Sequence, residues 1–196
     1  MATFEYAPAP ESRAVVDLRP SYGLFIGGEW VEGHGRAFKS VNPATEEVLA
    51  EVQEASDTDV DLAVRAARAA YEGVWGRMSG TDRGKYLFRI ARIIQERARE
   101  LAVLETLDNG KPIKESRDVD IPLVAAHFFY HAGWADKLAY AGVGVPGETP
   151  RPVGVVGQVI PWNFPLLMLA WKVAPALACG NTVVLTPAAT TQLTAL

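Results

Sequence analysis

Cysteine is almost absent from this chain of 196 residues, which contains only Cys179. A single cysteine cannot form an intrachain disulfide, and it excludes metal sites built from several cysteine ligands. This cysteine usage suits a reducing compartment, so we expect a cytoplasmic protein. An excess of positive charge is missing too. The formal net charge of -4 predicts no general attraction to nucleic acid or to anionic membranes.

Long uninterrupted hydrophobic runs are also lacking. The N-terminus, MATFEYAPAPESRAVVDLRP, has no continuous apolar stretch and carries two early prolines, so we expect no signal peptide. The most apolar region, residues 153–185, is interrupted by three prolines, Asn163 and Lys172. These interruptions argue against a membrane span and favour buried α/β structure. The overall composition, 49% hydrophobic and 21% charged, is typical of a globular protein.

The N-terminal third reads as an arm followed by strands and a helix. Residues 1–20 show no periodicity and predict an arm or a loosely docked tail. In YGLFIGGEWVEG, Gly27 and Gly28 separate two apolar runs and predict a hairpin. A turn at Asn42 and a strand over residues 48–52 follow. Ser56 then stands three residues before Asp59, which is capping-box spacing, and an amphipathic helix is expected after it.

Two further helices are expected in the middle of the chain. One long helical region begins near Thr81 and ends at DNGKP, where Gly110 is a C-cap signal and Pro112 prevents continuation. Its apolar stripe comprises Leu87, Ile90, Ala91, Ile94, Ala98 and Leu101. A basic row on another face of this helix, Lys85, Arg89 and Arg92, is interpreted as a solvated surface rather than a phosphate site. The second helix is expected over residues 119–140.

Two motifs in this region suggest chemistry but favour a plain interpretation. GVGVPG, residues 142–147, matches G-x-G-x-x-G, a loop that contacts pyrophosphate when it lies between a strand and a helix. Here a helix precedes the motif and Pro146 interrupts it, so a connecting loop is expected. In HFFYH, His127 and His131 share a helix face, but a zinc site needs further ligands and none stands nearby. We therefore expect histidines packed within a helical core and no metal.

The C-terminal stretch predicts a β-α-β unit. VGVVGQVI is nearly continuous apolar sequence, as in a central strand of a parallel sheet that is covered on both faces. PWNFP turns the chain, with Asn163 placed as a helix cap and Pro165 near the first helical position. LLMLAWKVAPALAC is apolar almost all round and predicts a buried helix closed by Gly180. NTVVLTP follows as a second strand. Ligands of such sheets bind at the carboxyl ends of the strands, here residues 160–163 and 186–189.

At these residues the chain resembles the aldehyde dehydrogenase superfamily. The block GQVIPWNFPLLMLAWKVAPALACGNTVVL carries the resemblance, and NPATEEVLAEV and LETLDNGKP support it upstream. The match covers everything after about residue 20, but only the N-terminal part of that family. It implies an α/β fold with a partial Rossmann-like parallel sheet and flanking helices, preceded by the hairpin and helices. Residues 21–196 are then an incomplete NAD(P)-binding domain.

The resemblance also implies roles for individual residues. Ile160, Pro161 and Trp162 would line the cofactor channel, and the Asn163 side-chain amide would donate to the oxyanion formed when a cysteine thiolate attacks the aldehyde. The alternative for Asn163 is a helix cap only. Lys172 would lie near the nicotinamide, or belong to the polar stripe of a buried helix.

Two positions depart from the family pattern. The family has a lysine and, three residues later, a glutamate that grip the adenosine ribose, and these positions are Thr186 and Ala189 here, separated by Pro187 and Ala188. We therefore expect weak binding of NAD or NADP. Cys179 ends a buried helix and is interpreted as an inert thiol. The nucleophile, the general base and the catalytic domain would lie beyond Leu196.

Two functional classes remain open from the sequence. The first is the N-terminal segment of an NAD(P)-dependent aldehyde dehydrogenase that converts an aldehyde to a carboxylic acid. This segment alone would be inactive, and it would bind its aldehyde substrate only together with the missing catalytic half. A complementing chain or a homo-oligomer is the expected partner. The second is a non-catalytic remnant or interaction module with weak or no nucleotide binding. The sequence selects neither the aldehyde nor NAD over NADP.

Overall fold

A computed structural model describes residues 12–142, 147–148 and 150–196. Its strands are β1 (Ser21–Tyr22), β2 (Leu24–Ile26), β3 (Glu29–Val31), β4 (Ala37–Val41), β5 (Val48–Gln53), β6 (Val155–Val159) and β7 (Thr182–Thr186). The α-helices are α1 (Asp57–Glu72), α2 (Val74–Arg77), α3 (Gly80–Glu96), α4 (Ala98–Asn109), α5 (Ile113–Glu115), α6 (Ile121–Trp134) and α7 (Pro165–Ala178). Short turns of other helix types are η1 (Arg13–Val15), η2 (Ser116–Asp120), η3 (Leu138–Tyr140) and η4 (Leu193–Ala195).

The N-terminal strands form the predicted hairpin and a separate three-stranded sheet. β2 and β3 pair antiparallel around Gly27 and Gly28, whose φ angles of 66° and 92° suit the tight turn. In the second sheet β5 lies between β1, which is parallel to it, and β4, which is antiparallel. Leu18 packs against the core beneath this sheet, so the part of the arm after residue 11 is docked.

Helix α1 begins as the capping box predicts. The Ser56 side chain accepts a hydrogen bond from the Asp59 amide, and the Asp59 carboxylate accepts one from the Ser56 amide in return. The apolar face of the helix is only partly covered, because Val60 and Val64 are exposed and Ala67 is buried. Amphipathic spacing therefore predicted the helix correctly but overstated how much of it is buried.

The predicted single helix over residues 81–109 is wrong in one respect. The helix is interrupted at Arg97, whose non-helical φ and ψ of -99° and 14° separate α3 from α4. The predicted stripe nevertheless packs as one cluster across both helices, and Gly110 closes α4 with a φ of 83°. The next helix, α6, starts after the π-helical turn η2 and ends at Trp134, six residues before the predicted end.

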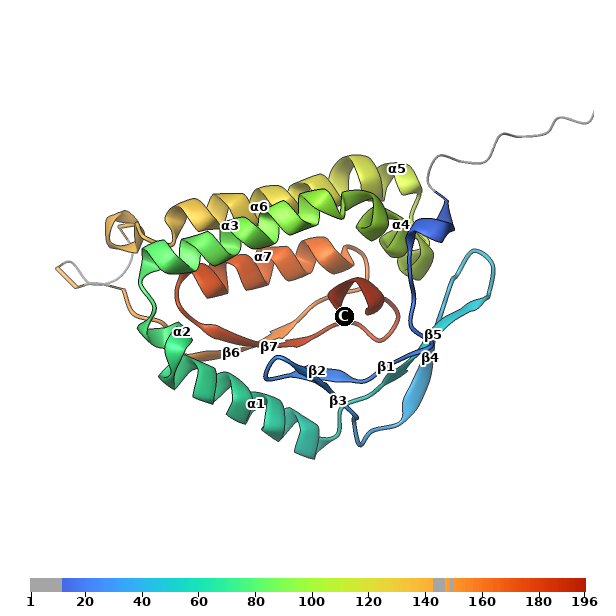
Figure 1. Ribbon diagram of the computed structural model, residues 1–196, viewed down its shortest axis with the longest axis horizontal. Coiled ribbons are helices and arrows are strands. Elements are labelled where there is room, and N and C mark those ends of the chain that lie inside the picture. Colours follow the sequence, from blue (N-terminus) through green and yellow to red (C-terminus); the bar gives the residue numbers. More distant parts are fainter. Residues whose placement is uncertain (1–11, 143–146, 149) are drawn as a thin grey trace, which may run out of the picture.

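The β-α-β unit is confirmed. β6 and β7 are parallel, in a register that pairs Val155 with Thr182 and Val159 with Thr186, and α7 connects them. Figure 1 shows α1 and α7 on opposite sides of the two strands, with α3 and α6 beyond α7.

Coverage of β6 on both faces is not observed. Helix α1 reaches the beginning of the strands, where the Thr182 hydroxyl donates to the Ala67 carbonyl at 2.9 Å. At the other end of β6, Val159 is 69% exposed. The apolar run thus predicted the strand, whereas the extent of its cover depended on where α1 lies.

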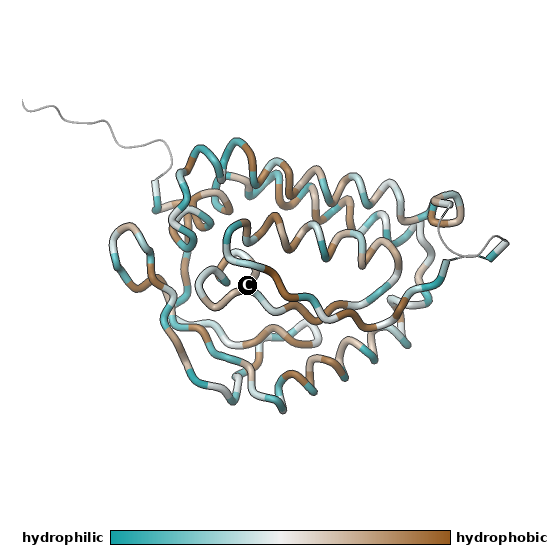
Figure 2. The backbone as a smooth tube through the Cα atoms, turned by 180° about the vertical axis from the view of Figure 1, so that it is seen from behind, coloured by the Kyte–Doolittle hydropathy of each residue, from teal (hydrophilic) through white to brown (hydrophobic). Residues whose placement is uncertain are grey.

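Two clusters of apolar side chains form the core. The larger joins α3, α4, α6 and α7, with Leu87, Ile121, Val124 and Ala170 at its centre. The smaller lies under β5 and includes Leu193 of η4, so the C-terminal segment packs back onto the N-terminal sheet. Figure 2 shows hydrophobic stretches along the central strands.

His127 and His131 both lie half-buried on helix α6. His127 and His131 stack with ring centroids 6.1 Å apart, and His131 is hydrogen-bonded through Nδ1 to the His127 carbonyl. No cluster of three or more His, Cys, Asp or Glu side chains in the described ranges is arranged to hold a metal ion. The expectation of a loop at GVGVPG falls partly on residues 143–146, outside the described residues. None of the described helices has the length and apolar character needed to cross a bilayer.

Candidate functional site

The structure brings the two predicted loops together at the carboxyl ends of β6 and β7. The Ile160 amide donates to the Thr186 carbonyl at 3.1 Å, which continues the parallel ladder one residue past β6. Ile160 is buried, whereas Pro161, Trp162 and Asn163 are exposed. The residues that follow each strand therefore start side by side, as expected for ligand-binding loops of an α/β sheet.

A hollow of about 420 Å³ lies beside these loops. Trp162 from the first loop and Ala189 from the second line it together with Asp108 and Asn109 at the end of α4. Trp162 is 64% exposed, so its indole offers an open apolar surface next to the strand ends. A flat ring system can pack on such a surface.

Asn163 does not cap helix α7, which corrects one prediction from the sequence. Pro165 is the first helical residue as predicted, but the N-cap is Phe164 and no side chain of the N-cap bonds to the helix. The exposed Asn163 side chain makes no hydrogen bond to any described residue. Its amide therefore remains available to donate to a ligand, and the sequence pattern misplaced the cap by one residue because Pro165 fixes where the helix starts.

Lys172 reaches the same strand end from within α7. Its ammonium donates to the Val159 carbonyl at 2.6 Å, and the Gln158 side chain donates to the Lys172 carbonyl at 2.9 Å. The positive charge is thus held immediately before the loop that carries Asn163.

The second loop offers no charged side chain. Thr186 and Ala189 are exposed and Pro187 and Ala188 are half-buried, so no ammonium or carboxylate extends from these four positions. Cys179, at the end of α7, is half-buried, and burial raises the pKa of its thiol while nearby Arg83 opposes that rise. A thiol with a raised pKa is a poor nucleophile at neutral pH.

A buried ionic cluster under the first loop was missed by the sequence analysis. The Lys111 Nζ lies 3.3 Å from Glu105 Oε1 and 2.5 Å from Asp120 Oδ2. Both carboxyl groups are fully buried. Burial raises the pKa of Glu105 to about 7, against the opposing charge of Lys111. Asp120 Oδ1 is buried without a hydrogen-bond partner among the described residues. One ammonium thus faces two carboxyl groups in the protein interior.

A signal for this cluster exists in the sequence. Glu105 lies four residues after Leu101 and Asp108 lies three residues after Glu105, so both continue the apolar stripe of the preceding residues. Acidic residues at apolar positions of a helix indicate buried and paired carboxyl groups. The structure confirms this for both: Asp108 is also buried and accepts hydrogen bonds from the Ser40 hydroxyl and the Leu193 amide.

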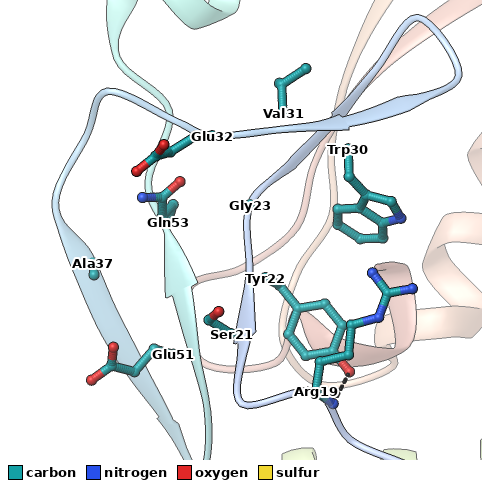
Figure 3. Close-up of a pocket in the computed structure, with 10 residues that line it drawn as sticks. All are labelled: Arg19, Ser21, Tyr22, Gly23, Trp30, Val31, Glu32, Ala37, Glu51 and Gln53. Carbon is teal, nitrogen blue, oxygen red and sulfur yellow. Dashed lines mark hydrogen bonds between the residues drawn. The ribbon is translucent and has the colours of Figure 1, made fainter.

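A second hollow, of about 500 Å³, lies between the N-terminal hairpin and the three-stranded sheet. Tyr22 and Trp30 form one wall, where the Arg19 guanidinium lies 5.4 Å from the indole ring, and Glu51 and Gln53 belong to the other side (Figure 3). None of its lining residues belongs to the loops at the ends of β6 and β7. The two hollows are therefore separate features.

Comparison with known proteins points to one family. A family model described as "Aldehyde dehydrogenase family" matches residues 30–196. The Arabidopsis thaliana protein "Aldehyde dehydrogenase family 2 member B4, mitochondrial" is 48% identical over 181 residues, which cover 88% of this chain and 33% of the relative. Retinal dehydrogenase 2 of Homo sapiens is 44% identical over 100% of this chain and 39% of its own length.

A solved structure agrees with these relatives. The NAD+ complex of aldehyde dehydrogenase from Bacillus cereus matches with a TM-score of 0.82 and 43% identity, over 92% of this chain and 40% of that one. The chain thus spans between about a third and two fifths of the length of these proteins and corresponds to their N-terminal part.

Proposed function

This chain belongs to the aldehyde dehydrogenase family, and from that premise we propose that it forms the cofactor-binding part of an enzyme that oxidises an aldehyde to a carboxylic acid with NAD or NADP. The observation that carries the proposal is the placement of Asn163. Its side chain is exposed and free of any capping role, and it follows Trp162, which lines the hollow beside the strand ends.

Asn163 would stabilise the negative charge that develops on the aldehyde oxygen. Its side-chain N–H can donate to that oxygen once a nucleophile has added to the carbonyl carbon. Removal of one such donor typically lowers kcat by about 10²- to 10³-fold. Lys172, fixed by the Val159 carbonyl, would add a positive charge at the same strand end, and we assign it an electrostatic rather than a proton-transfer role.

The described residues fit one end of a dinucleotide better than the other. The exposed faces of Val159 and Trp162 suit a planar ring beside the strand ends, and a bound nicotinamide cofactor supplies the hydride acceptor. Thr186 and Ala189 offer the ribose no charged group. Loss of a charge-assisted hydrogen bond costs about 1.5–3 kcal/mol, so the proposal includes weak binding at the adenosine end.

The proposal assigns turnover to an assembly rather than to these 196 residues alone. Cys179 is half-buried with a raised thiol pKa, so we place the nucleophile and the general base in the family's catalytic half. That half would meet this chain as a continuation, as a complementing chain or within a homo-oligomer. The cytoplasm remains our proposed compartment, although one of the relatives is named as mitochondrial.

A second function, a non-catalytic remnant or interaction module, is favoured by Thr186 and Ala189 in place of charged side chains. Calorimetric titration of NAD tests both functions in one experiment. The samples are the parent chain and a double variant, Thr186→Lys with Ala189→Glu. A matched control, Thr81→Lys with Ala126→Glu, adds the same charges at exposed helix positions.

We expect weak binding by the parent chain and the control, and at least about tenfold tighter binding by the Thr186→Lys/Ala189→Glu variant, the effect of about 1.5 kcal/mol. Circular dichroism checks that all three are folded. Folded proteins that all fail to bind NAD would support the remnant, and equal gains in both double variants would remove Thr186 and Ala189 from the site.

A further inference from the structure

The loop that carries Asn163 lacks local fastening. Helix α7 begins without a capping side chain, and Trp162, Asn163 and Phe164 are all exposed. An exposed turn of this kind is free to move unless other parts of the fold hold it. An oxyanion donor must, however, be fixed within a fraction of an ångström to be effective. The contacts that replace the missing cap come from the end of α4.

Glu105 supplies the first contact. Its Oε2 accepts a hydrogen bond from the Leu166 amide at 3.2 Å, and Leu166 is the second residue of α7. A fully buried carboxyl group therefore binds the open N-terminus of α7 from 61 residues away in the sequence. A carboxyl oxygen accepts this hydrogen bond whether or not the group carries a proton, so the contact does not require ionised Glu105.

Lys111 supplies the second contact. Its ammonium lies 4.4 Å from the centroid of the Phe164 ring, close enough for a cation–π interaction. The same ammonium is held by Glu105 and Asp120. The left-handed Gly110 turns the chain at the end of α4, and Lys111 follows it with its ammonium over the Phe164 ring.

Asn109 supplies the third contact, because its side-chain amide donates to the Trp162 carbonyl at 2.6 Å. Three side chains from residues 105–111 thus hold Trp162, Phe164 and Leu166, which bracket Asn163 on both sides. Asn163 itself is left free to bind a ligand. We propose that Glu105, Asn109 and Lys111 form a clamp, the 105–111 clamp, whose role is to position the Asn163 side chain.

This inference rests on the proposed function, since it gives the clamp a role in the oxidation site. The free-energy cost of burying the charged groups of Glu105, Lys111 and Asp120 supports this inference. Burying a carboxylate and an ammonium costs several kcal/mol per ion, and packed apolar side chains of similar volume often stabilise a fold at least as well. The directed contacts of this cluster to the Phe164 ring and to the Leu166 amide are what an apolar cluster would not provide.

The clamp can be tested in the 196-residue chain without any turnover. NMR on 15N-labelled protein follows the order parameter of the Asn163 side-chain amide and the hydrogen exchange of the Leu166 amide, with the Ala174 amide in the middle of α7 as an internal reference. The variants are Lys111→Met, which keeps the aliphatic stem, Lys111→Arg, which keeps the charge, and Asn109→Ala. Lys114→Met, at an exposed position of α5, is the matched control.

We expect Lys111→Met to accelerate exchange at Leu166 at least about tenfold relative to Ala174 and to lower the order parameter of Asn163. Lys111→Arg should keep the Leu166 exchange rate and the Asn163 order parameter close to those of the parent. Lys114→Met should change neither the exchange rate nor the order parameter. Equal acceleration at Leu166 and Ala174 would mean that the cluster only stabilises the helix and would overturn the clamp. So would a folded Lys111→Met protein whose Asn163 and Leu166 signals match those of the parent.

Asn109→Ala keeps the test decisive if Lys111→Met does not fold. Asn109 is half-buried at the edge of the hollow, so its removal leaves the ionic cluster in place. We expect it to lower the Asn163 order parameter alone, and an unchanged value would overturn the proposal. Because these signals require no NAD and no turnover, a negative result here is distinct from failure of the NAD titration.

Discussion

Replacing Glu105 with glutamine should remove a pH-dependent part of the stability of this chain. Burial raises the pKa of Glu105 from 4.5 to about 7, so between these pH values the folded chain binds a proton that the unfolded chain has lost. Stability from such a group is fully present below the unfolded pKa and is lost as pH rises through the folded pKa. The free energy of unfolding should therefore fall as pH rises from about 5 to 8.

The size of the effect follows from the pKa difference. At about 1.4 kcal/mol per pKa unit, the full difference corresponds to about 3 kcal/mol, of which roughly 2–3 kcal/mol is lost between pH 5 and pH 8. Glu105→Gln keeps the shape of the side chain and an oxygen that accepts from the Leu166 amide, but it cannot titrate. The parent should lose this much more stability than the variant.

Urea unfolding at pH 5 and pH 8, followed by circular dichroism, measures the difference. His34 and Asp108 also have raised pKa values, from the Asp59 partner and from burial respectively, so their stabilising effects are also lost as pH rises. These effects are common to both proteins and cancel when the variant is subtracted from the parent. Parallel declines in parent and variant would refute a buried, proton-binding Glu105.

Two further predictions concern single residues. Gly110→Ala should destabilise the chain by at least about 1–2 kcal/mol, because a Cβ at this left-handed position would lie 2.5 Å from the Pro43 ring. Gly133→Ala, in open space within α6, should leave the free energy of unfolding unchanged or raise it by up to about 1 kcal/mol. Urea unfolding measures both, and the opposite ranking of the two variants would contradict the geometry. Cys179 should react with iodoacetamide at neutral pH many times more slowly in the folded chain than in urea, because burial raises its pKa more than Arg83 lowers it; comparable rates in both states would show an open thiol.

The sequence by itself determined the local structure and the family. The hairpin at Gly27 and Gly28, the capping box at Ser56 and the end of α4 at Gly110 depend on interactions within a few residues, so pattern and residue type suffice to predict them. The β-α-β unit was predicted from the patterns of its three successive elements. The sequence also predicted that the loops after β6 and β7 lie side by side, because parallel strands joined by a helix end on the same side of the sheet.

Only the tertiary structure decided how Asn163 is held. From the sequence, Asn163 was predicted as the cap of α7, and α3 and α4 were predicted as one helix. The sequence also did not predict that one end of β6 is exposed. Each of these features depends on contacts between residues far apart in the chain. The bond from the Leu166 amide to Glu105 spans 61 residues and that from Asn109 to Trp162 spans 53. Local preference carries no information about such distances, so the clamp becomes visible only when α4 packs beside the start of α7.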